Sequence, residues 1–315
     1  MSLPGSRHLA TGIMTELALP PECFKEVDYT TFTGGELYVR AIHEDKGFLR
    51  GKDVIIAASI HDHTDLVWLC ALQDLVVNKQ ARRVFIAMPY LAYQTQEREV
   101  HPNDAVMARV VATMLCAGAG ASWNISRLIM DPHTEGAPNY FPSGLVPDVV
   151  QGRTVLLPVI QSLEEDLSML VVASADLGRP KWIENYARDL EINFALANKH
   201  RVGEHTETTH FVGGEFKGKR VVLYDDLTRS GSSAIKALQL YVDNGASGGY
   251  LVLSHLAANN EEALRLLANS GFIKIVVTDS HHFSQHPIVK QSDKFVVVPL
   301  AERIACRIRE IFAIN

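Results

Sequence analysis

The chain has 315 residues, of which 47% are hydrophobic and 21% are charged, and its formal net charge is −6 at pH 7. This composition predicts a soluble globular protein that is long enough for two domains. The acidic balance argues against general binding to nucleic acid or to anionic membranes, because both attract basic surfaces.

Secretion and membrane insertion also lack support in the sequence. Residues 1–8 have no apolar core of the kind that a secretory leader needs, and no apolar run approaches the roughly 20 residues of a membrane span. The four cysteines are scattered without a Cys-x-x-Cys pair, so neither a zinc site nor a disulfide framework is expected from them. We therefore expect a cytoplasmic protein.

Apolar strands and amphipathic helices alternate through the first half of the chain. Strands are predicted at residues 52–59, 83–88 and 127–130, and helices at residues 65–78 and 104–117. Pro89 follows the second strand, and the Gly118-Ala-Gly120 segment ends the second helix. Such alternation predicts an α/β fold with a doubly wound, mainly parallel sheet that helices flank.

The second half of the chain repeats this alternation. Strands are predicted at residues 154–158, 170–174, 221–224, 249–254, 273–277 and 294–298, and helices at residues 180–191, 234–242, 260–269 and 302–312. We expect two similar domains, residues 1–147 and 148–315, joined near the segment 142–151, which contains Pro and Gly. The last helix is expected to pack back on the N-terminal domain.

The segment at residues 220–235, RVVLYDDLTRSGSSAI, carries the strongest chemical pattern. A buried strand ends in Asp225 and Asp226, and a loop of small and hydroxylated residues, 228–233, precedes a helix. The loop N–H groups, its hydroxyls and the positive end of the helix dipole favour a phosphate. The two acids can hold the hydroxyls of a sugar or a hydrated divalent metal. The alternative is an ordinary strand-to-helix turn with a Ser N-cap and solvated acids.

This segment resembles the phosphoribosyl-diphosphate loop of type I phosphoribosyltransferases and of ribose-phosphate diphosphokinases. The acid pair matches the family pattern, whereas Arg229 stands where the family has a further acid, and the loop ends in Ser-Gly-Ser-Ser. The ribose-phosphate-binding residues that the resemblance implies are Asp225, Asp226, Thr228, Arg229, Ser230, Gly231, Ser232 and Ser233.

Two upstream segments resemble ATP-binding motifs of the diphosphokinases. Residues 32–36, FTGGE, are similar to a Phe-x-Asx-x-Glu motif that packs adenine and reaches a neighbouring subunit in relatives; an aromatic ring can stack on a base, and a carboxylate can accept from its amine. Residues 89–98 resemble the family's Pro-x-x-x-Tyr-x-Arg-Gln-Asp-Arg/Lys, with Thr95 in place of the first arginine. A solvated charged loop is the alternative there. The implied ATP-binding residues are Phe32, Glu36, Gln96, Glu97, Arg98 and His133.

Two further segments resemble metal and phosphate motifs of the family. Asp131-Pro-His133 is similar to Asp-Leu-His, whose histidine helps to bind the nucleotide and its Mg²⁺. Residues 174–178, SADLG, resemble the diphosphate loop Ser-Pro-Asp-x-Gly-Gly, in which a glycine lets backbone N–H groups approach phosphate. The implied diphosphate-loop residues are Asp176, Gly178 and Arg179, and the implied metal ligands are His133 and Asp176.

Lys199-His-Arg201 resembles the family's Lys-x-Arg at the root of a mobile catalytic loop. Phosphoryl transfer needs cations over the migrating group, because negative charge builds on its oxygens. Residues 203–209 are small and polar, as expected of a lid. The implied catalytic residues are Lys199, Arg201 and His133. This interpretation depends on Lys199 and Arg201 facing the turn after Asp226 across one cleft.

Together the motifs occur in family order between about residues 30 and 280, and they resemble a divergent ribose-phosphate diphosphokinase. The resemblance implies two type I phosphoribosyltransferase-like domains, Mg²⁺ as cofactor, ATP as co-substrate and a homo-oligomer, either a dimer or a hexamer. The implied reaction transfers diphosphate from ATP to the anomeric hydroxyl of ribose 5-phosphate and releases AMP.

Two alternatives stay open. The extra cations Arg179 and Arg229 favour ADP-ribose, a relative's acceptor in NAD salvage, because its 5-linked diphosphate carries more charge than a monophosphate. Thr95 and Arg229 instead favour a non-catalytic regulatory subunit that keeps the fold.

The remaining histidine-rich segments are interpreted as loops near the active site. His281, His282 and His286 are irregularly spaced, and no acid or cysteine completes a metal site beside them. The segment His61-Asp-His63 is interpreted in the same way.

Overall fold

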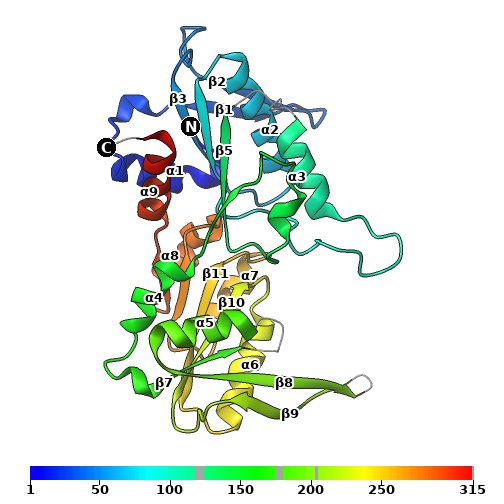
Figure 1. The fold of residues 1–315 in the computed structure, drawn as a ribbon, viewed down its shortest axis with the longest axis vertical. Helices are drawn as coiled ribbons and strands as arrows, with labels where there is room; N and C mark the ends of the chain where they lie inside the picture. The colour runs from blue at the N-terminus through cyan, green and yellow to red at the C-terminus, as the bar shows by residue number, and fades with distance from the viewer. Residues whose placement is uncertain (118–123, 175–179, 203–204, 314–315) are drawn as a thin grey trace. The chain divides into compact units, whose positions relative to one another are not determined.

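The computed structural model describes residues 1–117, 124–174, 180–202 and 205–313, with the backbone alone for residues 198–202 and 205–210. The chain divides into two compact units (Figure 1). The first unit contains residues 1–151, 280–282 and 299–315, and the second contains residues 152–279 and 283–298. Across these described ranges, no helix combines the length and the apolar character that crossing a membrane requires.

The first unit is built on a parallel sheet of four strands in the order β3-β4-β5-β6, beside a separate antiparallel hairpin of β1 and β2. Its strands in the described ranges are β1 (Val27–Thr31), β2 (Leu37–Ala41), β3 (Asp53–Ala57), β4 (Arg83–Ala87), β5 (Ile125–Met130) and β6 (Asp148–Val150). Its helices there are α1 (Arg7–Glu16), α2 (His63–Asn78), α3 (Met107–Ala117) and α9 (Ala301–Phe312), with 3-10 turns η1 (Pro4–Ser6), η2 (Pro21–Cys23) and η3 (Ala137–Tyr140).

The C-terminal helix α9 packs on the first unit, beside α1 (Figure 1). A Cβ atom on Gly12 of α1 would lie only 2.7 Å from the Cβ atom of Ala301, so the glycine permits the close approach of the two helices. The guanidinium of Arg83 lies 4.5 Å from the ring centre of Phe312 and donates to the Phe312 carbonyl at 3.2 Å. These contacts tie the end of the chain to strand β4.

The second unit is built on a sheet of seven strands in the order β13-β12-β11-β10-β7-β8-β9, which is parallel except for β9. Its strands in the described ranges are β7 (Leu170–Ser174), β8 (Asn193–Val202), β9 (His205–Gly213), β10 (Arg220–Leu227), β11 (Gly248–His255), β12 (Ile275–Thr278) and β13 (Phe295–Val298). Its helices there are α4 (Arg153–Gln161), α5 (Pro180–Leu190), α6 (Ser232–Asp243), α7 (Glu261–Ala268) and α8 (Pro287–Gln291), with 3-10 turns η4 (Leu167–Met169) and η5 (His282–Gln285), of which η5 begins at the junction of the two units.

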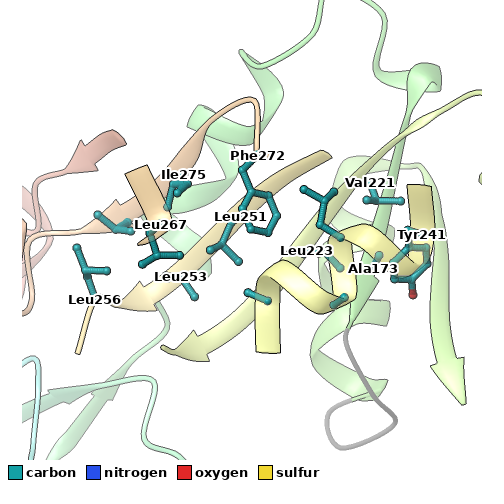
Figure 2. Packing of buried hydrophobic residues seen from close by; sticks show 14 of the residues in the cluster. Ala173, Val221, Leu223, Tyr241, Leu251, Leu253, Leu256, Leu267, Phe272 and Ile275 are labelled. Carbon is teal, nitrogen blue, oxygen red and sulfur yellow. The ribbon is translucent and has the colours of Figure 1, made fainter. Parts of the chain in front are cut away.

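Both faces of the central strands of this second sheet are buried. Side chains such as Val221 and Leu223 join one apolar cluster with helices α6 and α7 (Figure 2). Their neighbours Val222 and Tyr224 join the cluster on the opposite face, with helices α4 and α5. Successive residues of a strand point to opposite faces, so burial of both requires the continuous apolar runs seen in the sequence.

Two elements differ from the sequence-based expectations. Residues 154–158, predicted as a strand, lie in helix α4, where Leu156 and Ile160 are buried at helical spacing. The helix accommodates Pro158 because this residue and Thr154, whose carbonyl the proline cannot bond, are both exposed to water. Residues 205–209, predicted as part of a lid, lie in strand β9, which the β-branched threonines of this segment favour.

Tyr241 fixes helix α6 to the sheet. Its side chain is fully buried, and its hydroxyl lies 3.0 Å from the carbonyl oxygen of Ser174 and 2.9 Å from that of Ala195. Ser174 ends strand β7, and Ala195 lies in strand β8. The hydroxyl therefore joins the helix to two neighbouring strands beside the carboxyl edge of the sheet.

Replacing Tyr241 by Phe is expected to lower the free energy of unfolding by about 1–3 kcal/mol, because the single O–H donor shared by the buried carbonyls of Ser174 and Ala195 is lost. Urea unfolding of the variant measures this. The matched control is Tyr38→Phe, whose side chain is 41% exposed and whose change should stay within about 0.5 kcal/mol. Equal stability of Tyr241→Phe and the wild type would show that this hydroxyl does not anchor α6.

Candidate active site

The paired acids of the second unit lie where strand β10 ends. Asp226 is almost completely buried, at 2% exposure, whereas Asp225 is half-buried. A carboxylate oxygen of Asp225 accepts the backbone N–H of Asp226 at 2.9 Å, which orients that carboxylate. The two acids are thus fixed at the carboxyl edge of a parallel sheet, where ligands of open α/β folds commonly bind.

The loop that follows is shaped by its own hydroxyls. The Thr228 hydroxyl accepts the N–H of Gly231 at 3.1 Å, and the Ser230 hydroxyl accepts the N–H of Ser232 at 3.3 Å. The Arg229 carbonyl accepts the N–H of Asn259 at 2.9 Å, which joins the loop to the segment after β11. A hydroxyl that accepts one bond can still donate its own hydrogen, so Thr228 and Ser230 are able to donate to a phosphate oxygen.

Gly231 makes the turn from this loop into helix α6. It is the N-cap residue and has a φ of 78°, in the left-handed region that side chains other than glycine rarely adopt. A Cβ atom there would also lie 2.7 Å from a methyl carbon of Leu267 in α7. Glycine therefore lets the N-terminus of α6, with its partial positive charge, follow directly after the loop.

The backbone of Lys199 and Arg201 lies at the same edge of the sheet. Strands β10, β7 and β8 are parallel, with Leu223, Ala173 and Ala195 in register. Asp225 lies two residues beyond this line on β10 and Lys199 four residues beyond it on β8, so β8 extends about 7 Å further at about 3.3 Å per residue.

Lys199 was predicted at the root of a loop, but it lies within strand β8, opposite Thr208 of β9. The register shifts between Asn198 and Lys199, as at a β-bulge. Lys199 and Arg201 therefore belong to the β8–β9 hairpin rather than to a loop.

In the first unit, the segment after β4 carries Gln96, Glu97 and Arg98. The Arg98 side chain is 80% exposed and approaches the Glu97 carboxylate at 3.7 Å, a contact that contributes little at the surface. The Tyr140 hydroxyl donates to the Glu97 carbonyl, and the N–H of Ala108 reaches the Gln96 carbonyl at 3.2 Å. The backbone of this segment is thus fixed while Arg98 points into solvent.

Gln94 joins this segment to His133, and the sequence analysis did not single it out. The Gln94 side chain is buried, at 5% exposure, and its carbonyl oxygen accepts the backbone N–H of His133 at 2.9 Å. Asp131, two residues earlier, is fully buried with a φ of 37°. Gln94 directly follows Tyr93, which matches the family motif, and this position is the sequence signal that could have drawn attention to it.

Phe32 and Glu36 close the tip of the β1–β2 hairpin. The N–H of Phe32 donates to the Glu36 carbonyl at 2.9 Å, and Gly35 between them has a φ of 85°. The Phe32 side chain is 51% exposed, with its ring centre 5.5 Å from that of Tyr38. An aromatic ring at an exposed tip is available to stack on a planar group.

The predicted residues Asp176, Gly178 and Arg179 lie outside the described residues, as do residues 203 and 204 of the predicted lid. An apolar cavity of about 460 Å³ in the first unit is lined by α1, β3 and Phe312. None of the predicted site residues that the structure describes lines this cavity, so it is not the candidate active site.

The second unit is thus an α/β unit in which paired acids, a hydroxyl-rich loop and a helix N-terminus follow one another. Comparison with known proteins identifies similar proteins. Residues 1–120 match the family described as the N-terminal domain of ribose phosphate pyrophosphokinase.

Curated relatives named ribose-phosphate pyrophosphokinase cover much of the chain. The protein from Porphyromonas gingivalis is 27% identical over 308 residues, which is 97% of this chain and 92% of the relative. The protein from Synechocystis is 29% identical over 267 residues, which is 82% of this chain and 76% of the relative. These comparisons confirm the resemblance to the ribose-phosphate diphosphokinase family that the motifs indicated.

Among solved structures, phosphoribosylpyrophosphate synthetase from Mycobacterium smegmatis matches with a TM-score of 0.81. The match covers 100% of this chain and 98% of that chain at 23% identity. The predicted fold of two phosphoribosyltransferase-like α/β domains is confirmed.

Gly231→Ala is expected to lower the free energy of unfolding more than Gly218→Ala. Both glycines have a positive φ, 78° and 73°, so both variants carry a backbone cost of about 1–2 kcal/mol. Only Gly231 would place a Cβ atom against Leu267, because nothing lies within 4 Å of the Cβ position at Gly218. Parallel denaturant titrations measure the difference, and equal losses would contradict the close packing of the loop on α7.

Proposed function

We propose that the protein is a diphosphotransferase that moves diphosphate from Mg-ATP to the anomeric hydroxyl of ribose 5-phosphate, forming phosphoribosyl diphosphate and releasing AMP. The observation that carries this proposal is the succession of Asp225, Asp226, the loop and the N-terminus of α6 at one edge of the sheet. The names of the curated relatives, ribose-phosphate pyrophosphokinases, support it.

In this proposal the loop binds the 5-phosphate. The hydroxyls of Thr228, Ser230, Ser232 and Ser233 and the first N–H groups of α6 supply donors, and the helix dipole favours a negative group there. Asp225 and Asp226 accept hydrogen bonds from the ribose hydroxyls. Because the loop and the Asp225 carboxylate are already ordered by internal hydrogen bonds, little order would have to be created on binding.

Lys199 and Arg201 are proposed to supply positive charge to the migrating group, from a strand that continues beyond Asp225 at the same edge. Asp176, Gly178 and Arg179 are proposed for the diphosphate. Phe32 and Glu36 would hold adenine, and Gln96, Glu97, Arg98 and His133 would bind the rest of ATP. The reaction requires little acid–base chemistry, so positioning and charge account for most of the rate.

The residues at the end of β10 fit the Mg²⁺ that the proposal requires. Asp225 and Asp226 offer carboxylate oxygens, the hard ligands that Mg²⁺ prefers, often through its bound waters. Asp176 and His133 are further proposed ligands. When bound with ATP, Mg²⁺ supplies positive charge that offsets the phosphate oxygens.

The proposed assembly is a homo-oligomer. The exposed rings of Phe32 and Tyr38, with centres 5.5 Å apart, support this proposal, because adjacent exposed aromatic side chains offer an apolar surface to another molecule.

ADP-ribose is the second candidate acceptor. Arg229, which stands in place of a family acid, is exposed at the loop and would suit a 5-substituent with more negative charge than a monophosphate. The third candidate, a non-catalytic regulatory subunit, would keep nucleotide binding without transfer.

Incubation of the purified protein with Mg-ATP and either ribose 5-phosphate or ADP-ribose separates these candidates, with AMP and the diphosphorylated sugar measured by mass spectrometry. The proposal predicts equimolar AMP and phosphoribosyl diphosphate from ribose 5-phosphate. Product from ADP-ribose but not from ribose 5-phosphate would show that ADP-ribose is the acceptor. Nucleotide binding without product from either sugar would contradict the enzyme proposal.

Lys199→Ala serves as the mechanistic variant in the same assay. Loss of a cation at the migrating group is expected to lower turnover by about 10²–10³-fold or more with an unchanged unfolding midpoint. Lys236→Ala, which removes the same charge from an exposed position on α6, is the control and should retain wild-type turnover. An unchanged rate for Lys199→Ala would remove that residue from the mechanism.

A further inference from the structure

Three histidines that are far apart in the sequence form a cluster in the first unit. His61 lies between β3 and α2, whereas His281 and His282 follow strand β12. One ring nitrogen from each lies within 4.8 Å of those of the other two. The ring centres of His61 and His282 are 4.2 Å apart, and each lies 4.5 Å from that of His281.

An acid orients one of these rings, although the sequence analysis found none beside the histidines. A carboxylate oxygen of Asp65 lies 2.6 Å from Nδ1 of His61. Asp65 is itself held in the first turn of α2, because its N–H donates to the N-cap residue Asp62 at 3.0 Å. A histidine that donates Nδ1–H to a carboxylate presents Nε2 as a lone-pair nitrogen, the arrangement found around many metal ions.

Nε2 of His61 faces the backbone of His282. The backbone N–H of His282 approaches it at 3.3 Å, which is longer than the usual 2.9–3.0 Å of such bonds. A metal ion on Nε2 would take the place of this long contact.

The cluster is enclosed and held in place by its neighbours. The His281 side chain is only 4% exposed, and its ring packs edge-on against Tyr90, with ring centres 4.8 Å apart. A Cβ atom on Gly5 would lie 2.9 Å from the His61 ring, so the glycine lets the backbone close over it.

We propose that His61, His281 and His282 bind a divalent transition-metal ion, with Zn²⁺ as the preferred ion and Asp65 positioning His61. Imidazole nitrogens favour zinc, copper and nickel over magnesium. Three protein ligands with a water in the fourth position are typical of catalytic zinc sites, with Zn–N bonds of about 2.0–2.1 Å. Two such bonds at a tetrahedral angle place nitrogens about 3.4 Å apart, so side-chain movements of about 1 Å would close the site.

The proposed metal ion would have a structural effect. The Ser59 hydroxyl already donates to the Ser280 carbonyl at 2.6 Å. A metal ion would add bonds between these same two segments, which are far apart in the sequence. The ion would thereby secure residues 280–282 on the first unit, to which they belong.

Cobalt binding tests the proposal directly, because Co²⁺ occupies zinc sites and absorbs visible light. The full-length protein is freed of metal with a chelator and titrated with Co²⁺ in excess Mg²⁺, and Zn²⁺ is then added. We expect one equivalent of Co²⁺ with the strong absorption of a four-coordinate site, displaced by one equivalent of Zn²⁺. His282→Ala should abolish this absorption, and Asp65→Asn should weaken Co²⁺ binding by about 10–100-fold.

His63→Ala is the matched control, because His63 is exposed and lies outside the cluster; it should bind Co²⁺ as the wild type does. Circular dichroism confirms that each variant is folded, and His281→Gln substitutes for any variant that is not. A folded His282→Ala or His281→Gln protein with wild-type Co²⁺ affinity, or a wild type that binds no Co²⁺, would overturn the proposal.

Discussion

The parallel, in-register pairing of β10, β7 and β8 is the constraint on which the candidate active site depends. It places the ends of three strands at one edge of the second sheet: the acids near the end of β10, Ser174 before the predicted diphosphate loop, and the continuation of β8 with Lys199. The pairing is secured by apolar side chains on both faces of the sheet and by the Tyr241 hydroxyl. Predicted site residues from distant parts of the sequence therefore lie at the same edge, because the strands that carry them belong to one continuous, buried sheet.

The loop of residues 228–233, at the same edge of the sheet, is ordered by its own hydrogen bonds. Gly231 turns the chain into α6 with a positive φ, and the hydroxyls of Thr228 and Ser230 take up N–H groups of the loop. The first unit shows a comparable device, in which the buried Gln94 holds the backbone at His133. In both units, hydrogen bonds fix the backbone of segments that carry predicted ligand-binding residues, which would lower the entropy cost of binding.

Many of the helices and strands could be predicted from local sequence, and the wrong assignments have physical causes. The apolar runs of β7, β10 and β11 and the spacing in α2 and α5 were sufficient, because both faces of the sheet and one face of each helix are buried. Residues 154–158 were misassigned because a short apolar run with β-branched residues fits a strand as well as a helix. The polar β9 has no apolar alternation and is defined by its pairing with β8.

The acids and the loop of the candidate active site are adjacent in sequence, so a motif reveals them. The histidine cluster joins positions 221 residues apart, and Gln94 contacts the backbone of His133, 39 residues further along the chain. Only the folded chain brings such residues together, and for this reason the sequence analysis interpreted the histidines as loop residues.

The central claim is that the loop after β10 binds the phosphate of a ribose 5-phosphoryl sugar. Amide hydrogen exchange of residues 228–233 with and without saturating ribose 5-phosphate tests it most directly. The account predicts slower exchange in this loop and the first turn of α6, and unchanged exchange in α7. Exchange in the loop at the same rate with and without the sugar, in a sample shown to bind it, would contradict the account.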